Sequence, residues 1–144
     1  MPCHFEFDPK NKLLRVRLEG RITTEAAREH YRAAGHYVVL TRPRASIWDL
    51  SGVTSLEVST DAVASLARSV PALPEPERPR IIVAPSAHVF GLARMFQALG
   101  EGARPRLKVV RTLEEASALL GVQTARFEPL PALESELPTS PGEG

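Results

Sequence analysis

The run Ala45-Ser-Ile-Trp-Asp-Leu50 is short, mostly apolar, and bounded by Pro43 and Gly52. Apolar residues at successive positions are typical of a strand that is buried on both faces. The run Arg80-Ile-Ile-Val-Ala84 repeats the pattern. Strands of this kind occur in parallel sheets that have helices packed against them. The two runs therefore predict the core of an α/β protein.

A helical segment follows each of these runs. From about Thr60, apolar residues recur at helical spacing, and Ser59 or Thr60 offers an oxygen for the N-cap. A third strand at 107–110 precedes Thr112 and Glu115, which are three residues apart and form a capping-box pattern. Because strands that alternate with helices require right-handed crossovers, this order predicts a largely parallel sheet.

The beginning of the chain predicts a hairpin. Residues 4–7 and 13–19 are the two strands, and the segment between them contains Pro and Asn, which favour turns. Residues 13–19 alternate between apolar and charged side chains, and Gly20 is expected to end this strand. A helix capped by Thr23 or Thr24 follows.

The fold class expected from these elements is α/β. We expect one layer of mixed, mostly parallel sheet, with an antiparallel hairpin at its N-terminal end and about four helices, the first loosening near Gly35. An unpaired outer hairpin strand would invite pairing with a second copy of the chain, so a homodimer is one expected state. Lys12, Arg15 and Arg17 would oppose that pairing.

Composition excludes several classes of function. The 18 basic and 17 acidic residues leave a net charge of +1, which provides no strong field for nucleic acid. Cys3 is the single cysteine, and the four histidines lack the spacing of metal ligands, so we expect no metal or other cofactor. No apolar run approaches the roughly 18 residues of a membrane span. We therefore expect a cytoplasmic protein without stable membrane insertion.

The C-terminal part of the chain differs in composition from the rest. Residues 124–144 contain four prolines and four glutamates, which favours a mobile tail after a single domain at residues 1–123. Leu130, Leu133 and Leu137 recur at helical spacing, so the alternative is that the tail docks on a partner or on the domain itself.

In open α/β sheets, ligands gather beyond the carboxyl ends of the strands. Here that rim holds Asp49, Ser51 and Ser86. His88 is close enough in sequence to Ser86 to suggest a Ser/His hydrolase. The chain has no G-x-S-x-G motif and no evident third catalytic group, so this remains a minor alternative.

Two motifs carry a resemblance to a known family. They are Leu18-Glu-Gly-Arg-Ile-Thr23 and Ile47-Trp-Asp-Leu-Ser-Gly-Val53. Together with the order of elements over residues 4–122, they resemble the STAS superfamily, and in particular its SpoIIAA-like branch of anti-sigma-factor antagonists. The resemblance implies a noncatalytic regulatory module whose partner is a protein, such as a kinase-like anti-sigma factor.

In those antagonists, a serine in an Asp-Ser-Ser-Gly loop is phosphorylated by the partner kinase. Alignment from Asp49 without a gap places residues 57–60 on this loop, with Ser59 on the phosphoacceptor and Glu57 on the acid. Val58 and Thr60 depart from the pattern. The implied contact surface runs from Ser51 to Arg68, and its candidate binding residues are Asp49, Ser51, Glu57, Thr60, Asp61 and Ser86.

The same resemblance implies an alternative function. The fold also occurs in SEC14-related lipid carriers, so the apolar faces around Leu66, Phe90 and Phe96 could part to hold a small apolar ligand or an acyl chain. A densely packed core competes with this interpretation, because the few aromatic residues are also needed to fill the interior.

Overall fold

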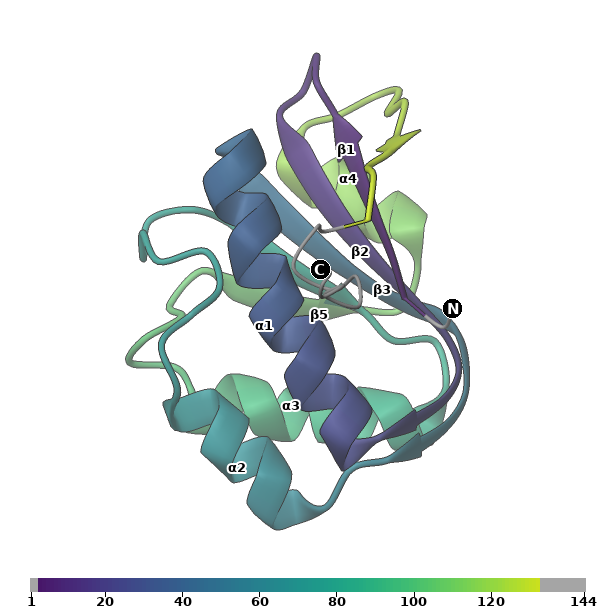
Figure 1. The fold of residues 1–144 in the computed structure, drawn as a ribbon, viewed down its shortest axis with the longest axis vertical. Coiled ribbons are helices and arrows are strands. Elements are labelled where there is room, and N and C mark those ends of the chain that lie inside the picture. Colours follow the sequence, from purple (N-terminus) through teal and green to yellow (C-terminus); the bar gives the residue numbers. More distant parts are fainter. Residues whose placement is uncertain (1–2, 133–144) are drawn as a thin grey trace, which may run out of the picture.

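The computed structural model describes residues 3–132 and shows one sheet with four helices (Figure 1). The strand order in the sheet is β5-β4-β3-β2-β1-β6. Strands β2, β3, β4 and β5 pair in parallel, whereas β1 is antiparallel to both β2 and β6. The elements are β1 (Cys3–Asp8), β2 (Leu13–Thr23), α1 (Thr24–Thr41), β3 (Ala45–Glu57), α2 (Thr60–Arg68), β4 (Arg80–Val83), α3 (Ala87–Leu99), β5 (Leu107–Val110), α4 (Leu113–Leu120) and β6 (Glu128–Pro129).

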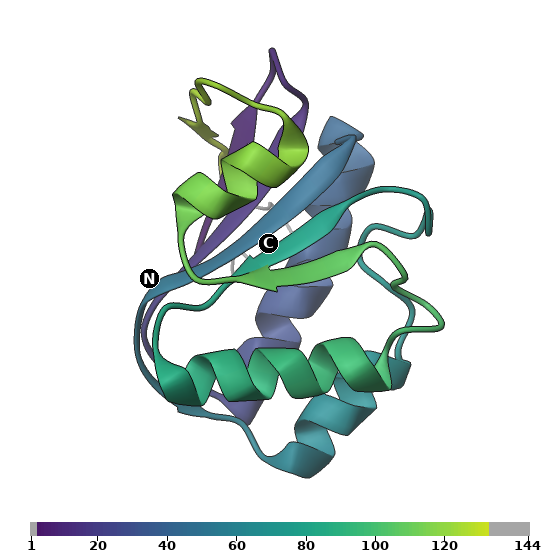
Figure 2. The same ribbon diagram turned by 180° about the vertical axis from the view of Figure 1, so that it is seen from behind.

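The predicted fold class is confirmed, and the helices cover the two faces of the sheet unequally. Helix α1 packs Ala34 against Val16 and Ile22 of β2, and α3 packs on the same face. Helix α4 packs Ala116 against Ile47 and neighbouring apolar residues on the opposite face. Figure 2 brings α4 in front of the sheet, whereas α1 lies behind it. Alternate residues of the central strands therefore contact different helices.

The sequence predicted that β2 ends at Gly20, but the strand continues past this residue. Gly20 has a φ of +75°, and the register between β2 and β3 shifts on both sides of Glu19 and Gly20. The strand continues through this irregularity to Thr23 and keeps its pairing with β3 up to Glu57. At each shift β3 has one residue more than β2, so the irregularity lies in β3, and Gly20 continues β2 past it in a left-handed conformation.

The expected loosening of the first helix near Gly35 does not occur. Gly35 lies in the middle of α1, and the helix ends only where Arg42 adopts the left-handed conformation with a φ of +49°. Tyr37 and Val38 follow the glycine and pack in a buried cluster with Leu14. Burial of this second half of the helix outweighs the weak helix propensity of one glycine.

The predicted helix N-caps are confirmed. The side-chain oxygens of Thr23, Ser59, Ser86 and Thr112 each accept a hydrogen bond from the backbone N–H three residues later. Thr112 and Glu115 also form the expected capping box. Each of the four helices follows a parallel strand and thus begins at the same rim of the sheet, beyond the carboxyl ends of β2, β3, β4 and β5.

Residues 124–132, which the sequence assigned to a mobile tail, are part of the folded domain. Strand β6 pairs with Glu6 and Phe7 of β1. Phe127 packs on the core beneath α4, and Leu130 packs against the cluster of Leu14 and Tyr37. The boundary near residue 123 is therefore too early, and part of the hairpin edge is already paired. Leu133 and Leu137 lie outside the described residues.

Candidate functional site

The candidate contact surface begins where β3 meets α2. Ser59 is exposed and has extended backbone angles, and its Oγ accepts the N–H of Ala62 at 3.1 Å. Thr60 and Asp61 are exposed in the first turn of α2, and Arg68 is exposed in its last turn. The helix is held by its other side, since Ala62, Val63 and Ala67 are buried. Its polar side is therefore free to contact a partner.

Glu57 ends β3 beside this helix start and is held by a basic residue from β2. Its Oε2 accepts a hydrogen bond from Arg21 Nε at 2.8 Å and another from Ser55 Oγ at 3.0 Å. The hydrogen bond from Arg21, followed by that from Ser55, lowers the pKa of the Glu57 carboxyl. Because both charged side chains are largely exposed, this pair orients the strand end but adds little stability.

Asp49 and Ser51 come together within β3, as neighbours two residues apart. Asp49 is buried, and its Oδ1 accepts the backbone N–H of Ser51 at 3.0 Å and the Ser51 hydroxyl at 2.6 Å. The Asp49 carboxylate faces the side of the sheet that carries Arg15, with 4.0 Å between Oδ2 and Nη1. The hydrogen bonds of Asp49 thus lie within β3, on the sheet face that carries Arg15 and not on the polar side of α2.

Arg15 and Arg17 lie on the face of the sheet, where both bond Glu6 across the hairpin. Burial raises the pKa of Glu6, but the hydrogen bonds from Arg17 and Arg15 outweigh it, so that this pKa is lowered overall. The two arginines that were expected to guard the hairpin edge are therefore engaged in an ion-pair network within the hairpin.

Ser86 and His88 do not form the pair that hydrolysis would need. Ser86 Oγ accepts the N–H of Val89 at 3.4 Å, and His88 Nε2 lies 3.3 Å from the carbonyl oxygen of Leu56. Within the described part of the chain, no hydrogen bond joins the two side chains. The contact of His88 with Leu56 does bring the start of α3 next to the end of β3.

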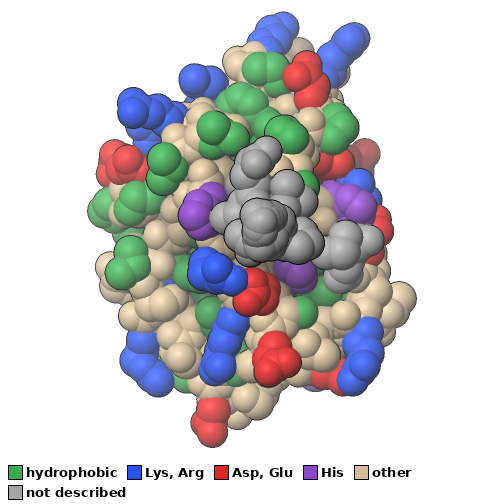
Figure 3. Space-filling view, in the orientation of Figure 1, with side chains coloured by type: hydrophobic (Ala, Val, Ile, Leu, Met, Phe, Trp, Pro, Cys, Tyr) green, Lys and Arg blue, Asp and Glu red, His purple; other side chains and the backbone are tan. Residues whose placement is uncertain are grey.

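The charges on the molecule are mixed on the face shown in Figure 3. Basic and acidic side chains are interspersed there, and no broad region of one sign covers the helices. Among residues 3–132, no group of three potential metal ligands comes together. None of the helices in those residues is both long and apolar enough to cross a bilayer.

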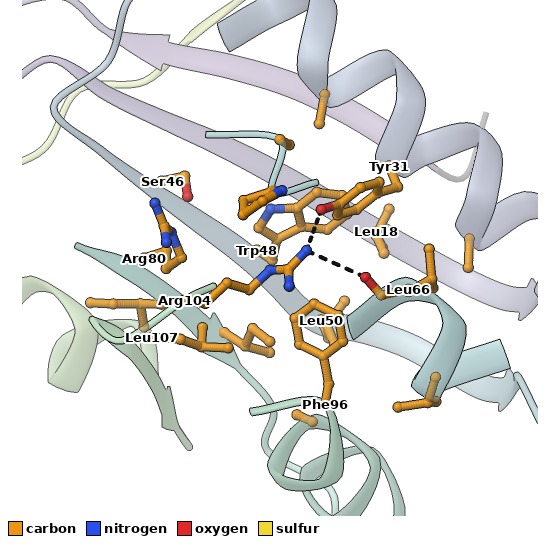
Figure 4. A pocket seen from close by; sticks show the side chains of 18 of the residues that line it. Leu18, Tyr31, Ser46, Trp48, Leu50, Leu66, Arg80, Phe96, Arg104 and Leu107 are labelled. Atoms are coloured by element: carbon orange, nitrogen blue, oxygen red, sulfur yellow. Dashed lines mark hydrogen bonds between the residues drawn. The ribbon is translucent and has the colours of Figure 1, made fainter. Parts of the chain in front are cut away.

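A cavity of about 170 Å³ lies between the sheet and helices α1, α2 and α3 (Figure 4). Its wall is almost entirely apolar and includes Leu18, Trp48, Leu50, Leu66 and Phe96. Leu66 and Phe96 were expected to border a space for an apolar ligand. Phe90 was named with them, but it packs in a separate cluster, where the guanidinium of Arg111 lies 4.1 Å from its ring centre.

The sequence did not single out Arg80 and Arg104, which also line this cavity. Arg80 opens β4, and the two-residue period of a strand places it on the same face as Ile82, below the helices. The alternation of β4 could therefore have predicted that Arg80 lies beneath the helices. Arg104 lies in the loop before β5, where no local pattern indicates the direction of a side chain.

Comparison with known proteins identifies the fold. No family model matches the chain, and no curated protein matches its sequence. The anti-sigma factor antagonist SpoIIAA in its unphosphorylated form superposes with a TM-score of 0.56 at 16% identity, over 85% of this chain and 99% of that chain. The phosphorylated form of the Bacillus cell fate determinant SpoIIAA gives 0.52 at 19% identity, over 82% and 98%.

An anti-sigma factor antagonist from Mycobacterium paratuberculosis gives a TM-score of 0.52 at 20% identity, over 83% of this chain and 92% of that chain. The chain therefore has the STAS fold of the SpoIIAA type, as its two motifs and its order of elements predicted. At these identities the likeness extends to the fold alone.

Proposed function

We propose that this chain is a noncatalytic, cytoplasmic regulatory module that binds a protein partner through the surface of residues 51–68, here called the α2 surface. The observation that carries the proposal is the position of Ser59. It is an exposed serine at the start of the helix that follows the central strand, in a fold shared with anti-sigma factor antagonists. The partner class that this supports is a kinase-like anti-sigma factor.

The local physics of Ser59 suits a switch. The first backbone N–H groups of a helix and the positive end of its dipole stabilise a phosphate at this position. Phosphorylation would also place about two negative charges beside Asp61 and Glu57 on the same surface. A partner that recognises the neutral hydroxyl would then meet an altered charge, so phosphorylation would weaken the complex.

Two substitutions of Ser59 distinguish the effect of an added negative charge on partner binding from the effect of losing the helix N-cap. Asn and Asp both cap helices about as well as Ser, so Ser59→Asn and Ser59→Asp keep the helix while only the second adds charge. We expect a kinase-like anti-sigma factor from the native host to be retained by the immobilised wild type and Ser59→Asn, and about tenfold less by Ser59→Asp. The measurement is quantitative mass spectrometry of the retained proteins.

Incubation of the retained kinase with ATP tests the modification directly, because Ser59 would then be found phosphorylated in the wild type. Thr112→Asp is the matched control, since it adds the same charge at the N-cap of α4, on the other face of the sheet, and should leave retention unchanged. Equal retention of the kinase by Ser59→Asp and Ser59→Asn would show that Ser59 lies outside the contact. Retention of no kinase by any variant would remove the proposed partner class.

A further inference from the structure

Two arginine side chains are buried beside the apolar cavity. Arg80 is only 5% exposed and Arg104 only 3% exposed. Neither forms an ion pair with a carboxylate within residues 3–132, and both border a space whose other walls are almost entirely apolar. Buried charges in proteins are normally paired, so these two guanidinium groups need an explanation.

Arg104 has a structural explanation. Its Nη1 donates to the carbonyl oxygen of Ala67 at 2.8 Å, and its Nη2 donates to those of Leu66 and Ser69 at 3.3 and 3.2 Å. Nη2 also hydrogen-bonds the hydroxyl of Tyr31 (Figure 4). These carbonyls belong to the C-terminal end of α2, where the helix dipole favours a cation. Arg104 therefore caps the C-terminal end of α2 and links this helix to Tyr31 of α1.

Arg80 is only half satisfied. Its Nη2 donates to the carbonyl oxygens of Leu73 and Glu75, each at 2.8 Å. Its Nε and Nη1 are buried and have no hydrogen-bond partner in the described part of the chain. Burial lowers the pKa of Arg80, and the nearby charge of Arg104 lowers it further, although Tyr31, Glu75 and Glu77 act in the opposite sense. Two unused donors on a buried cation favour an anion as the missing partner.

The size of the cavity limits what that anion is attached to. A cavity of 150 Å³ lined by apolar side chains accommodates a benzene molecule. The space of about 170 Å³ thus suits one aromatic ring or a short aliphatic chain, and is too small for a long acyl chain. Arg80 and Ser46 lie side by side at one part of the wall, while Leu50 and Phe96 lie at another (Figure 4). The wall is therefore polar in one place and apolar elsewhere.

We propose that this cavity binds a small amphipathic carboxylate, with Arg80 as the group that recognises its anionic head. The ring or short chain would fill the apolar space beside Trp48 and Phe96. The carboxylate would accept a charge-assisted hydrogen bond from Nε, while Nη1 lies on the other side of the guanidinium group. Because Nε is buried in the protein rather than open to the cavity, binding includes a turn of the Arg80 side chain toward the ligand. This site is independent of Ser59 and of a protein partner.

Matched acid and amide pairs test the proposal. Phenylacetate with phenylacetamide probes the ring, and octanoate with octanamide probes the chain, because each pair differs in charge but hardly in size. By isothermal titration calorimetry at pH 7, we expect one acid to bind the wild-type chain at least about tenfold more tightly than its amide, the factor that a hydrogen bond to a charged group contributes. Arg80→Met should abolish this preference.

Arg94→Met is the control variant, because Arg94 is exposed on α3 and should leave the preference unchanged. A measurement on the wild type keeps the test valid if Arg80→Met fails to fold. In ¹H–¹⁵N spectra of the arginine side chains, the Nε–H signal of Arg80 should shift with the acid but not with the amide. Equal affinity for acid and amide, or no binding of either pair at millimolar concentration, would overturn the proposal.

Discussion

Asp8 is the residue that joins the two ends of the folded chain. It is 1% exposed, and its Oδ1 accepts the backbone N–H groups of Lys10 and Asn11, which closes the hairpin turn. Its Oδ2 accepts the side-chain amide of Asn11 at 2.8 Å and the backbone N–H of Arg126 at 3.1 Å. One carboxylate thus satisfies donors from the hairpin turn and from the segment that leads into β6.

These bonds make Asp8 a source of pH-dependent stability. Burial raises its pKa, but the hydrogen bonds from Asn11 and Arg126 outweigh burial and leave the pKa below its ordinary value of 3.8. The stabilisation is therefore complete above pH 3.8 and is lost as the pH falls below that value. We expect Asp8→Asn to lower the free energy of unfolding by about 2 kcal/mol at pH 7 and by less at pH 3.

Urea denaturation at the two pH values measures this effect, and Glu101→Gln, at an exposed carboxylate in a loop, is the control that should change little. A loss of stability that is the same at pH 3 and pH 7 would show that the shape of the Asp8 side chain matters, and not its charge.

At the scale of the elements, two glycines differ in backbone conformation and therefore in their effect on stability. Gly20 has a left-handed backbone between the two positions at which β3 has an extra residue opposite β2. Gly35 has ordinary helical geometry within α1, and an added Cβ at either position would meet no atom within 4 Å. A methyl group therefore has room at both positions, and only the backbone conformation differs between them.

Alanine substitution should therefore have opposite effects on stability. Gly35→Ala is expected to raise the free energy of unfolding by up to about 1 kcal/mol, because alanine loses less backbone entropy in a helix. Gly20→Ala is expected to lower it by about 1 kcal/mol, since a Cβ disfavours the left-handed region. Thermal unfolding of the two variants beside the wild type checks both signs. A stabilising Gly20→Ala would contradict the left-handed backbone of this residue.

At the scale of the whole molecule, residues 124–132 complete the domain. Tyr37 of α1 donates its hydroxyl to the carbonyl oxygen of Pro131 at 2.5 Å, and the Phe127 ring lies 4.5 Å from the guanidinium of Arg15. Leu130 is joined to Phe5 through its backbone N–H. The segment therefore contacts both faces of the sheet and pairs with its edge.

Removal of this segment should destabilise the entire domain. A chain that ends at residue 123 loses strand β6 and the packing of Phe127 and Leu130, and we expect its free energy of unfolding to fall by more than about 2 kcal/mol. A chain that ends at residue 132 is the matched control, because it keeps all of these contacts. Equal urea midpoints for the two truncated chains would show that the segment contributes nothing to stability.

The sequence by itself determined the α/β class, the order from β1 to α4 and the helix caps, including that of Ser59. These features depend on patterns within one strand, or on a hydrogen bond between residues three apart, so they are readable locally. It could not determine that β6 pairs with β1, that α1 stays regular at Gly35, or that Arg80 and Arg104 meet at one cavity. Those outcomes depend on apolar burial and hydrogen bonds between segments that are distant in sequence and adjacent only after folding, and only the tertiary structure decided them.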